Sequence, residues 1–212
     1  MTRSSSKDRG SVDRLEVSFL TSAPSLRQCP APDMPEIAFA GRSNAGKSSV
    51  LNRLTGSRQT AKVSKTPGRT QLLNFFSVAD GGRLVDLPGY GYAKAARKTQ
   101  KEWQRSVNDY LSNRDALSAV VLVTDIRHPN QDFDVDLIDW AVASAMPLLV
   151  LLNKADKLGR NAQMKALHAL QRAVAEAPLV RVLLFSAQSG VGTDEAVGWV
   201  RERLGADHQV AP

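Results

Sequence analysis

The segment Gly41-Arg-Ser-Asn-Ala-Gly-Lys-Ser48 constrains the fold of this chain more than any other part of its sequence. It fits the pattern G-x-x-x-x-G-K-[ST] without a mismatch, an apolar segment at 37–40 precedes it, and helical spacing at 49–54 follows it. Such a strand, glycine-rich turn and helix can wrap backbone N–H groups around a phosphate. A chance glycine-rich turn is the alternative, but the flanking segments favour a site for a nucleoside triphosphate.

The residues of this loop have expected roles. The ammonium group of Lys47 should reach the β- and γ-phosphates, and the hydroxyl group of Ser48 should bind Mg²⁺. The loop residues predicted to contact the nucleotide are Gly41, Arg42, Ser43, Asn44, Ala45, Gly46, Lys47, Ser48 and Ser49.

From residue 36 onward, the pattern predicts alternating strands and helices. The predicted strands are 36–40, 71–78, 83–86, 119–125, 147–152 and 180–185, and the predicted helices are 47–55, 98–113, 132–145, 160–175 and 193–204. Segment 119–124 is apolar on both faces, as in a parallel sheet covered by helices, whereas 71–78 and 83–86 are close enough to form a hairpin. We therefore expect an α/β fold of three layers, with a mostly parallel six-stranded sheet, one antiparallel strand and helices on both faces. Segment 15–20 is a candidate for an extra edge strand.

Length and composition fit one such domain. The 212 residues suffice for a single core, which we place at 15–204 between a disordered tail at 1–14 and a flexible tail at 205–212. No apolar run approaches the roughly 20 residues of a membrane-spanning helix. The polar N-terminal segment is unlike a secretory signal, and Cys29 alone cannot form an internal disulfide, so we predict a cytoplasmic protein.

A second motif, Asp86-Leu-Pro-Gly89, ends the predicted strand 83–86. A carboxylate at the end of a parallel strand near the phosphate loop suits Mg²⁺, usually through a water molecule. The N–H group of Gly89 can contact the γ-phosphate, because glycine permits a close approach. The pattern alone is more typical of a turn. Together with the phosphate loop it predicts nucleotide contacts from Asp86, Leu87, Pro88 and Gly89.

Two further motifs predict which base is bound. Asn153-Lys-Ala-Asp156 follows a predicted strand, and its Asp156 carboxylate can accept hydrogen bonds from guanine N1–H and the exocyclic amine. Adenine lacks this donor pair, so the motif favours GTP over ATP; a polar loop with a capping aspartate is the alternative. The stem of Lys154 can cover the base, and Asn153 can tie this loop to the phosphate loop. After the next strand, the N–H group of Ala187 can donate to guanine O6. The base-site prediction comprises Asn153, Lys154, Ala155, Asp156, Phe185, Ser186 and Ala187.

Three longer segments narrow the interpretation. Segments 41–49, 65–76 (Lys-Thr-Pro-Gly-Arg-Thr-Gln-Leu-Leu-Asn-Phe-Phe) and 86–93 (Asp-Leu-Pro-Gly-Tyr-Gly-Tyr-Ala) resemble the EngB family, also called YihA or YsxC, of translation-factor-related P-loop GTPases. Segments 35–40 and 122–128 fit the same family, and the resemblance runs from about Leu15 to Leu204. It implies a GTPase that is needed for assembly of the large ribosomal subunit and is associated with formation of the division septum.

The resemblance also implies which threonine completes the site. Thr66 and Thr70 are both candidates for the switch residue that binds Mg²⁺, and the family pattern Pro-Gly-x-Thr before the strand favours Thr70. The nucleotide contacts expected from this region are those of Gly68, Arg69, Thr70, Gln71 and Leu72. The catalytic assignment is then Lys47, Thr70 and Gly89, and the Mg²⁺ assignment is Ser48, Thr70 and Asp86.

Hydrolysis of GTP needs an oriented water molecule. Ras-like proteins use a glutamine directly after the Asp-x-x-Gly motif, whereas this chain has Tyr90 there. A phenol is a poor substitute for that amide, so we predict slow intrinsic hydrolysis that a partner stimulates. Asn44 has two open roles: it can stabilise the loop, or it can help to bind K⁺, as in several related GTPases.

The net charge of the chain suggests which class of partner it binds. The formal net charge of +7 suggests a polyanion, and the resemblance implies rRNA and the precursor of the large subunit. Arg97, Lys98, Lys101 and Arg105 form a basic stripe on a predicted helix, for which an ordinary solvated face is the alternative. We expect a monomer. Two other functions stay open: a division-linked scaffold in which GTP is mainly structural, and a GTPase that acts on transfer RNA.

Overall fold

The computed structural model describes residues 14–57, 72–89, 97–129 and 132–205, with the backbone alone at 97–104. The strands are β1 (Val17–Ala23), β2 (Glu36–Gly41), β3 (Leu73–Val78), β4 (Arg83–Asp86), β5 (Leu117–Asp125), β6 (Leu148–Asn153) and β7 (Val180–Leu184). The α-helices are α1 (Lys47–Thr55), α3 (Arg97–Asn113), α4 (Asp132–Ala143), α5 (Arg160–Ala173) and α6 (Thr193–Leu204), with short 3-10 turns at Leu26–Gln28 and Ala155–Lys157. Except for Arg14 and Gly205, the predicted tails lie outside the described residues, as do the segments around Thr70 and Tyr90.

One sheet organises this part of the chain, in the order β1-β3-β4-β2-β5-β6-β7. β3 is antiparallel to both of its neighbours, while β2 pairs in parallel with β4 and β5, and β6 pairs in parallel with β5 and β7. The prediction of a mostly parallel sheet with one antiparallel strand is therefore confirmed.

The predicted count of six strands is wrong, because β1 is a seventh strand at the edge of the sheet. The candidate edge strand at 15–20 is thus confirmed, with bounds shifted to 17–23; Phe19 and Leu20 stay exposed, as is common on an edge strand. Pairing with β3 stabilises it, and Phe19 packs edge-to-face on Phe76 with 5.8 Å between ring centroids.

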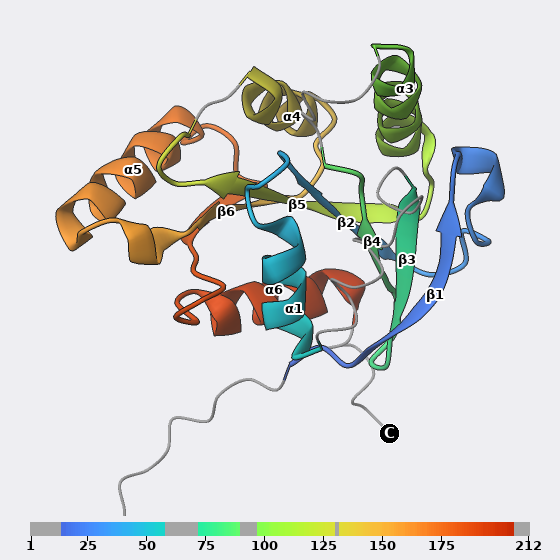
Figure 1. Ribbon diagram of the computed structural model, residues 1–212, viewed down its shortest axis with the longest axis horizontal. Coiled ribbons are helices and arrows are strands. Elements are labelled where there is room, and N and C mark those ends of the chain that lie inside the picture. The colour runs from blue at the N-terminus through green and yellow to red at the C-terminus, as the bar shows by residue number, and fades with distance from the viewer. Residues whose placement is uncertain (1–13, 58–71, 90–96, 130–131, 206–212) are drawn as a thin grey trace, which may run out of the picture.

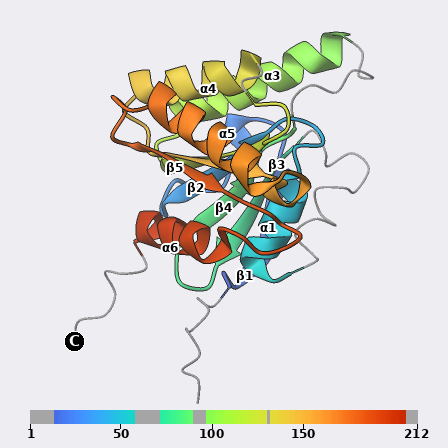
Figure 2. The same cartoon turned by 90° about the vertical axis from the view of Figure 1, so that its left-hand side faces the viewer.

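Helices cover both faces of the sheet, as predicted. α3, α4 and α5 lie on one face, and α1 and α6 lie on the other (Figures 1 and 2). Each face has its own apolar core: Tyr110, Leu137 and Leu170 contribute to the first, and Leu51 and Val200 contribute to the second. α4 ends two residues before the predicted end, because Ala145 adopts a left-handed backbone conformation with φ 51°.

At the amino ends of β2 and β4, a charged cluster is buried. The Glu36 carboxylate is fully buried and accepts hydrogen bonds from Arg114 (2.5 and 2.8 Å), Tyr110 (2.8 Å) and Arg83 (3.4 Å). Burial, followed by the nearby Glu36 charge, raises the pKa of the Tyr110 phenol well above its ordinary value. The cluster fastens α3 and the two strands together at this end.

The opposite, carboxyl ends of the parallel strands face a different set of segments. β2 leads into the phosphate loop, β4 into Asp86–Gly89, and β6 into the loop that begins at Asn153. The chain leaves β2 toward one face of the sheet and β4 toward the other, and such a switch point is where open α/β sheets bind ligands (Figure 1).

Candidate guanine-nucleotide site

The phosphate loop has the expected backbone. It runs from the end of β2 into the first turn of α1, and two of its residues are left-handed, Asn44 with φ 69° and Gly46 with φ 99°. Gly41 lies so close to β5 that a Cβ atom there would come within 2.7 Å of the Val123 carbonyl oxygen. The first N–H groups of a helix have no partner inside that helix, so the start of α1 offers them to an anion.

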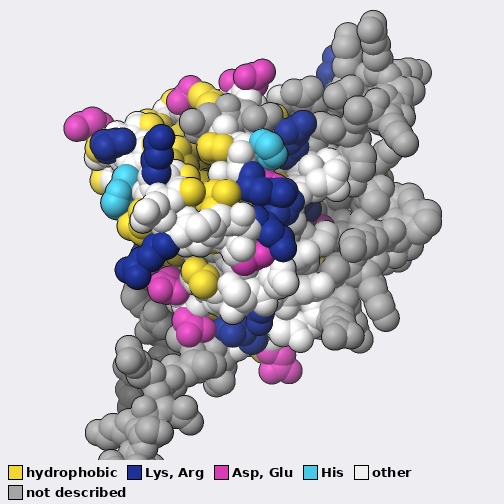
Figure 3. Space-filling model, turned by 60° about the vertical axis from the view of Figure 1, so that its left-hand side comes forward, with side chains coloured by type: hydrophobic (Ala, Val, Ile, Leu, Met, Phe, Trp, Pro, Cys, Tyr) yellow, Lys and Arg dark blue, Asp and Glu magenta, His cyan; other side chains and the backbone are white. Residues whose placement is uncertain are grey.

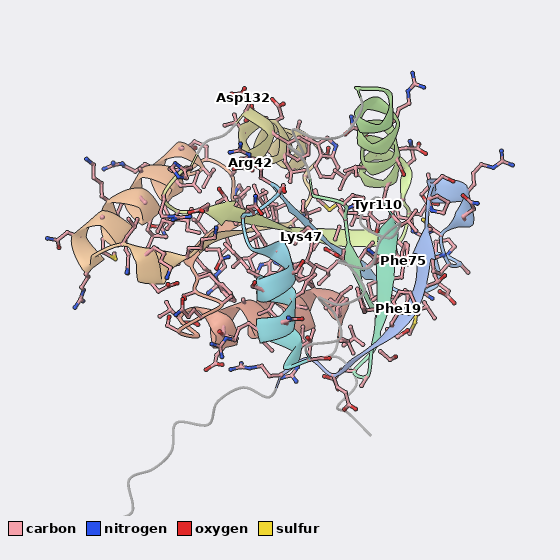
Figure 4. The ribbon with its side chains drawn as sticks, in the orientation of Figure 1. Phe19, Arg42, Lys47, Phe75, Tyr110 and Asp132 are labelled. Atoms are coloured by element: carbon pink, nitrogen blue, oxygen red, sulfur yellow. The ribbon has the colours of Figure 1, made fainter. Side chains whose placement is uncertain are left out.

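A pocket of about 450 Å³ opens beside this loop. Its lining comprises Arg42, Ser43, Asn44, Gly46, Lys47, Ser48, Ser49, Asn74, Asp86, Leu87, Pro88, Gly89 and Lys154. Figure 4 shows Lys47 at the start of α1, with Arg42 on the same edge of the sheet toward α4. The pocket thus brings the first two predicted motifs together, and it adds Asn74 of β3, which the sequence did not single out.

Inside the pocket, Lys47 pairs with Asp86. Both side chains are buried, with 10% and 2% of the side-chain surface exposed, and the ammonium group donates to Oδ1 of Asp86. Gly89 follows two residues after the buried Leu87, and a Cβ atom on Gly89 would lie 3.6 Å from the Gly41 carbonyl oxygen and from the Ser43 nitrogen. The motif at 86–89 therefore lies directly against the phosphate loop.

Asn153 connects the base loop to the phosphate loop. Its side-chain NH₂ group donates to the Ala45 carbonyl oxygen (2.8 Å), and its side-chain oxygen accepts from the Ala187 N–H group (3.3 Å). The amide of Ala187 is thus turned toward Asn153 here. Ala155 and Phe185 are buried and joined by a backbone hydrogen bond of 3.0 Å, so they support the loop from below.

Lys154 lies across the phosphate loop. Its backbone is left-handed, with φ 65°, and its ammonium group donates to the Asn44 carbonyl oxygen (2.6 Å) and to Oδ2 of Asp125 (2.8 Å). A Cβ atom on Gly46 would lie 3.8 Å from Lys154 Cε. With both ends fixed, the aliphatic stem forms part of the pocket wall, as expected for a residue that covers a base.

Asp125 was not predicted, and it holds Lys154 in place. Arg127 donates to the same carboxylate through Nε (2.9 Å), its terminal NH₂ group (2.7 Å) and its backbone N–H (3.1 Å). Burial acts to raise the pKa of Asp125, but the hydrogen bonds from Arg127 and Lys154 outweigh burial and hold that pKa well below its ordinary value. The signal in the sequence is an acidic residue at the carboxyl end of β5, opposite Asn153 in the sheet register.

A second pocket, of about 310 Å³, adjoins the first and shares Gly46, Ser49 and Lys154 with it. It is lined by Gly46, Ser49, Asn153, Lys154, Asp156, Lys157, Ala187 and Gln188. The Ser186 hydroxyl donates to Asp156 (2.6 Å), and Lys157 lies 3.2 Å from its other oxygen. The hydrogen bond from Ser186, aided by Lys157, holds the pKa of Asp156 below its ordinary value, so the carboxylate is ionised at neutral pH.

The chain matches known proteins over most of its length. The family model for 50S ribosome-binding GTPases matches residues 36–154, more than half of the chain. The probable GTP-binding protein EngB of Haemophilus influenzae (strain PittEE) is 49% identical over 84% of this chain and 87% of the relative. The protein of the same name from Coxiella burnetii (strain RSA 331 / Henzerling II) is 50% identical over 85% of this chain and 88% of the relative. This chain belongs to the EngB family.

Solved structures share the fold of this EngB-family chain. A crystal structure of a probable GTP-binding protein EngB has a TM-score of 0.66 at 24% identity and covers 80% of this chain and 98% of its own. A variant of Era from Aquifex aeolicus bound to GDP·AlF₄⁻ has a TM-score of 0.58 at 20% identity and covers 80% of this chain and 56% of its own. These identities show the fold alone; the family model and the curated relatives show a GTP-binding protein with a GTPase domain.

Some predicted residues of the EngB-family site lie outside this description. These are Gly68, Arg69, Thr70 and Gln71, together with Thr66 and Tyr90. Leu72 is described, and its carbonyl oxygen accepts from the Asn74 side chain (3.3 Å), but Asn74 lines the phosphate pocket and Leu72 does not.

The basic stripe predicted on α3 is described only in part. Arg105 is exposed, whereas the side chains of Arg97, Lys98 and Lys101 lie outside the description. None of the described helices is both long enough and apolar enough to cross a membrane.

Proposed function

We propose that this GTPase is a nucleotide-controlled switch in the assembly of the large ribosomal subunit. The observation that carries the proposal is that a pocket lined by Asn153, Lys154 and Asp156 adjoins the phosphate-loop pocket in a chain that matches the 50S ribosome-binding GTPase family. Discrimination of GTP by Asp156 and a sensor of the γ-phosphate at Gly89 supply the two properties that a switch needs.

The phosphates would be held by the loop from Gly41 to Ser49 and by Lys47. Because Lys47 already pairs with Asp86, arrival of the triphosphate would give the ammonium group a second anionic partner in the same buried place. Gly89 lies against the loop and would donate its N–H group to the γ-phosphate, and Thr70 would close the site from the other switch segment. Lys47, Thr70 and Gly89 would thus stabilise the charge that develops during hydrolysis.

The donors present fit Mg²⁺. Ser48 and Asp86 both line the phosphate pocket and offer hydroxyl and carboxylate oxygens, which a hard cation prefers, and Thr70 would add a third oxygen. Bound there, Mg²⁺ would neutralise charge on the phosphates. Asn44 is exposed at the rim of the pocket with a left-handed backbone, from which it would either brace the loop or help to bind K⁺.

The base would lie in the second pocket. Asp156 would accept from the guanine N1–H and amine groups, Lys154 would cover the ring, and Ala187 would exchange its long bond to Asn153 for one to guanine O6. Ala155, Phe185 and Ser186 would hold this loop in shape. Slow intrinsic hydrolysis is part of the proposal, because Tyr90 stands where a water-orienting glutamine is usual.

The family and the net charge support a proposal for where this switch acts and what it contacts. We place the protein in the cytoplasm as a monomeric G domain at 15–204 flanked by flexible tails. The basic stripe on α3, formed by Arg97, Lys98, Lys101 and Arg105, would contact rRNA. Normal septation would depend on the protein. A division-linked scaffold with structural GTP is the second candidate, which predicts that a hydrolysis-dead protein still supports division.

A change of nucleotide specificity tests the proposal. Wild-type protein should sediment with purified large subunits in the presence of a non-hydrolysable GTP analogue, and not with the xanthosine analogue. Asp156→Asn should reverse this preference, because an amide NH₂ group matches the oxygen that xanthine carries in place of the guanine amine. Sedimentation that ignores the nucleotide in both proteins would contradict the switch.

A further inference from the structure

The outward face of α5 carries basic and neutral side chains and no acidic one. Asn161, Lys165, His168 and Arg172 are all exposed, and their spacing of four, three and four residues places them on one side of the helix. The opposite side packs into the core through Ala166, Leu167, Leu170 and Val174. We call the four exposed residues the α5 stripe; it extends for about 16 Å at the usual helical rise of 1.5 Å per residue.

The basic charges of the stripe have no acidic residue on the same helix. No Asp or Glu occurs between Arg160 and Ala173. Neither Lys165 nor Arg172 forms an ion pair with a described residue, whereas several basic side chains elsewhere have carboxylate partners. Such pairs are Arg14–Asp194, Arg83–Asp33, Arg114–Glu36, Arg127–Asp125, Lys154–Asp125 and Arg201–Asp80. Figure 3 shows this side of the molecule, where Lys, Arg and His side chains are interspersed with hydrophobic side chains and a few Asp and Glu side chains.

We propose that the α5 stripe is a binding surface for the sugar–phosphate backbone of folded RNA. All four side chains can donate hydrogen bonds, which suits phosphate oxygens and 2′-hydroxyl groups, and the stripe holds no carboxylate to repel them. A solvated helix face normally mixes both signs of charge, and this one does not. The proposal rests on the proposed function, since it names a second RNA contact for the same protein.

The position of α5 gives this contact a distinct role. Gln163 donates to the carbonyl oxygens of Ala155 (2.9 Å) and Leu158 (2.8 Å), which fastens the helix to the base loop. The base is common to GTP and GDP, whereas the γ-phosphate would contact Gly89, which precedes α3 in the sequence. The α5 stripe therefore binds RNA equally in both nucleotide states, and the α3 stripe supplies the nucleotide-dependent part.

Fluorescence anisotropy with a labelled RNA hairpin of about 16 base pairs tests this, from 50 to 300 mM KCl with GDP or a non-hydrolysable GTP analogue. Lys165→Gln combined with Arg172→Gln should weaken binding about tenfold at 100 mM KCl. It should also lower the slope of log K against log salt by about two, since each lost phosphate contact removes about 0.9. Both losses should be equal with the two nucleotides.

The control is Arg14→Gln combined with Arg27→Gln, which removes the same charge away from α5: Arg14 pairs with Asp194 of α6, and Arg27 lies in the 3-10 turn after β1. GDP affinity and the melting temperature check that each variant is folded. If the control variant lost as much RNA affinity as the α5 variant, or if the α5 variant bound RNA as tightly as wild type, the α5 stripe would not be an RNA-binding surface. If the α5 variant lost RNA affinity only with the GTP analogue, RNA binding by the α5 stripe would depend on the nucleotide. If wild-type protein bound neither the hairpin nor large subunits, the proposed function itself would fail.

Discussion

Two buried charge clusters occupy the two ends of the same strands, and they differ in how completely they are satisfied. β4 contributes Arg83 to the amino-end cluster and Asp86 to the carboxyl-end pair. At the amino end, both oxygens of Glu36 are bonded to arginine or tyrosine donors. At the carboxyl end, Lys47 and Asp86 line a pocket that a charged ligand can enter.

This difference distinguishes charged residues that stabilise the fold from charged residues that can bind a ligand. A buried charge costs free energy of folding unless hydrogen bonds or ion pairs compensate it. The partners of Glu36 are all side chains of this protein. Lys47 and Asp86 compensate each other and also line the pocket, so we expect part of their interaction to be exchanged for interactions with a ligand. Substitutions should therefore affect stability at one end and nucleotide binding at the other.

The largest effect should come from Glu36→Ala. Removal of the carboxylate leaves the partly buried Arg114 and Arg83 without their shared partner, so the free energy of unfolding should fall by about 3–5 kcal/mol. Urea denaturation measures this. Asp33→Asn is the control, because Asp33 also pairs with Arg83 but its side chain is 63% exposed, and its effect should be small. GDP affinity of the folded fraction should be unchanged; a large loss would show that the clusters are coupled.

Lys47→Ala should have the opposite profile. The β- and γ-phosphates lose their buried cation, so GTP affinity should fall about 100-fold, in line with the 2–5 kcal/mol cost of truncating one partner of a buried charge pair. Isothermal titration calorimetry measures the affinity. Urea denaturation without nucleotide should show a smaller loss of stability than Glu36→Ala. An equal or greater loss would mean that the Lys47–Asp86 pair is structural.

Asp156→Asn tests the base side of the same end. GTP affinity should fall by about 30- to 100-fold while affinity for xanthosine triphosphate rises, because an unpaired polar group is left against the wrong base. Competition binding with the two nucleotides measures the change. Lys157→Gln is the control: its ion pair with Asp156 is 50% exposed on the lysine side, so GTP affinity should hardly change. Unchanged GTP affinity in Asp156→Asn would make the base assignment wrong.

The two ends also differed in how far the sequence could predict them. The carboxyl-end motifs are contiguous and depend on backbone shape, so the strand 83–86 and the helix 47–55 were predicted at the limits that β4 and α1 have. Glu36, Tyr110 and Arg114 are far apart in the chain, and nothing local marks them as partners. Asp125 was missed for the same reason, because its role appears only once β5 and β6 are paired.

Asp125 gives the smallest and most specific test, because we expect it to affect the nucleotide only through its contact with Lys154. Asp125→Ala should weaken GDP and GTP equally, by about tenfold, which corresponds to about 1.4 kcal/mol for one hydrogen bond to a charged group. Since the carboxylate only positions the lysine, Asp125→Ala should have no further effect in a Lys154→Ala background, and the hydrolysis rate at saturating GTP should not change. Asp194→Ala, which removes an exposed ion pair to Arg14, is the control for charge alone. Additive losses in the double variant would show that Asp125 contributes independently of Lys154.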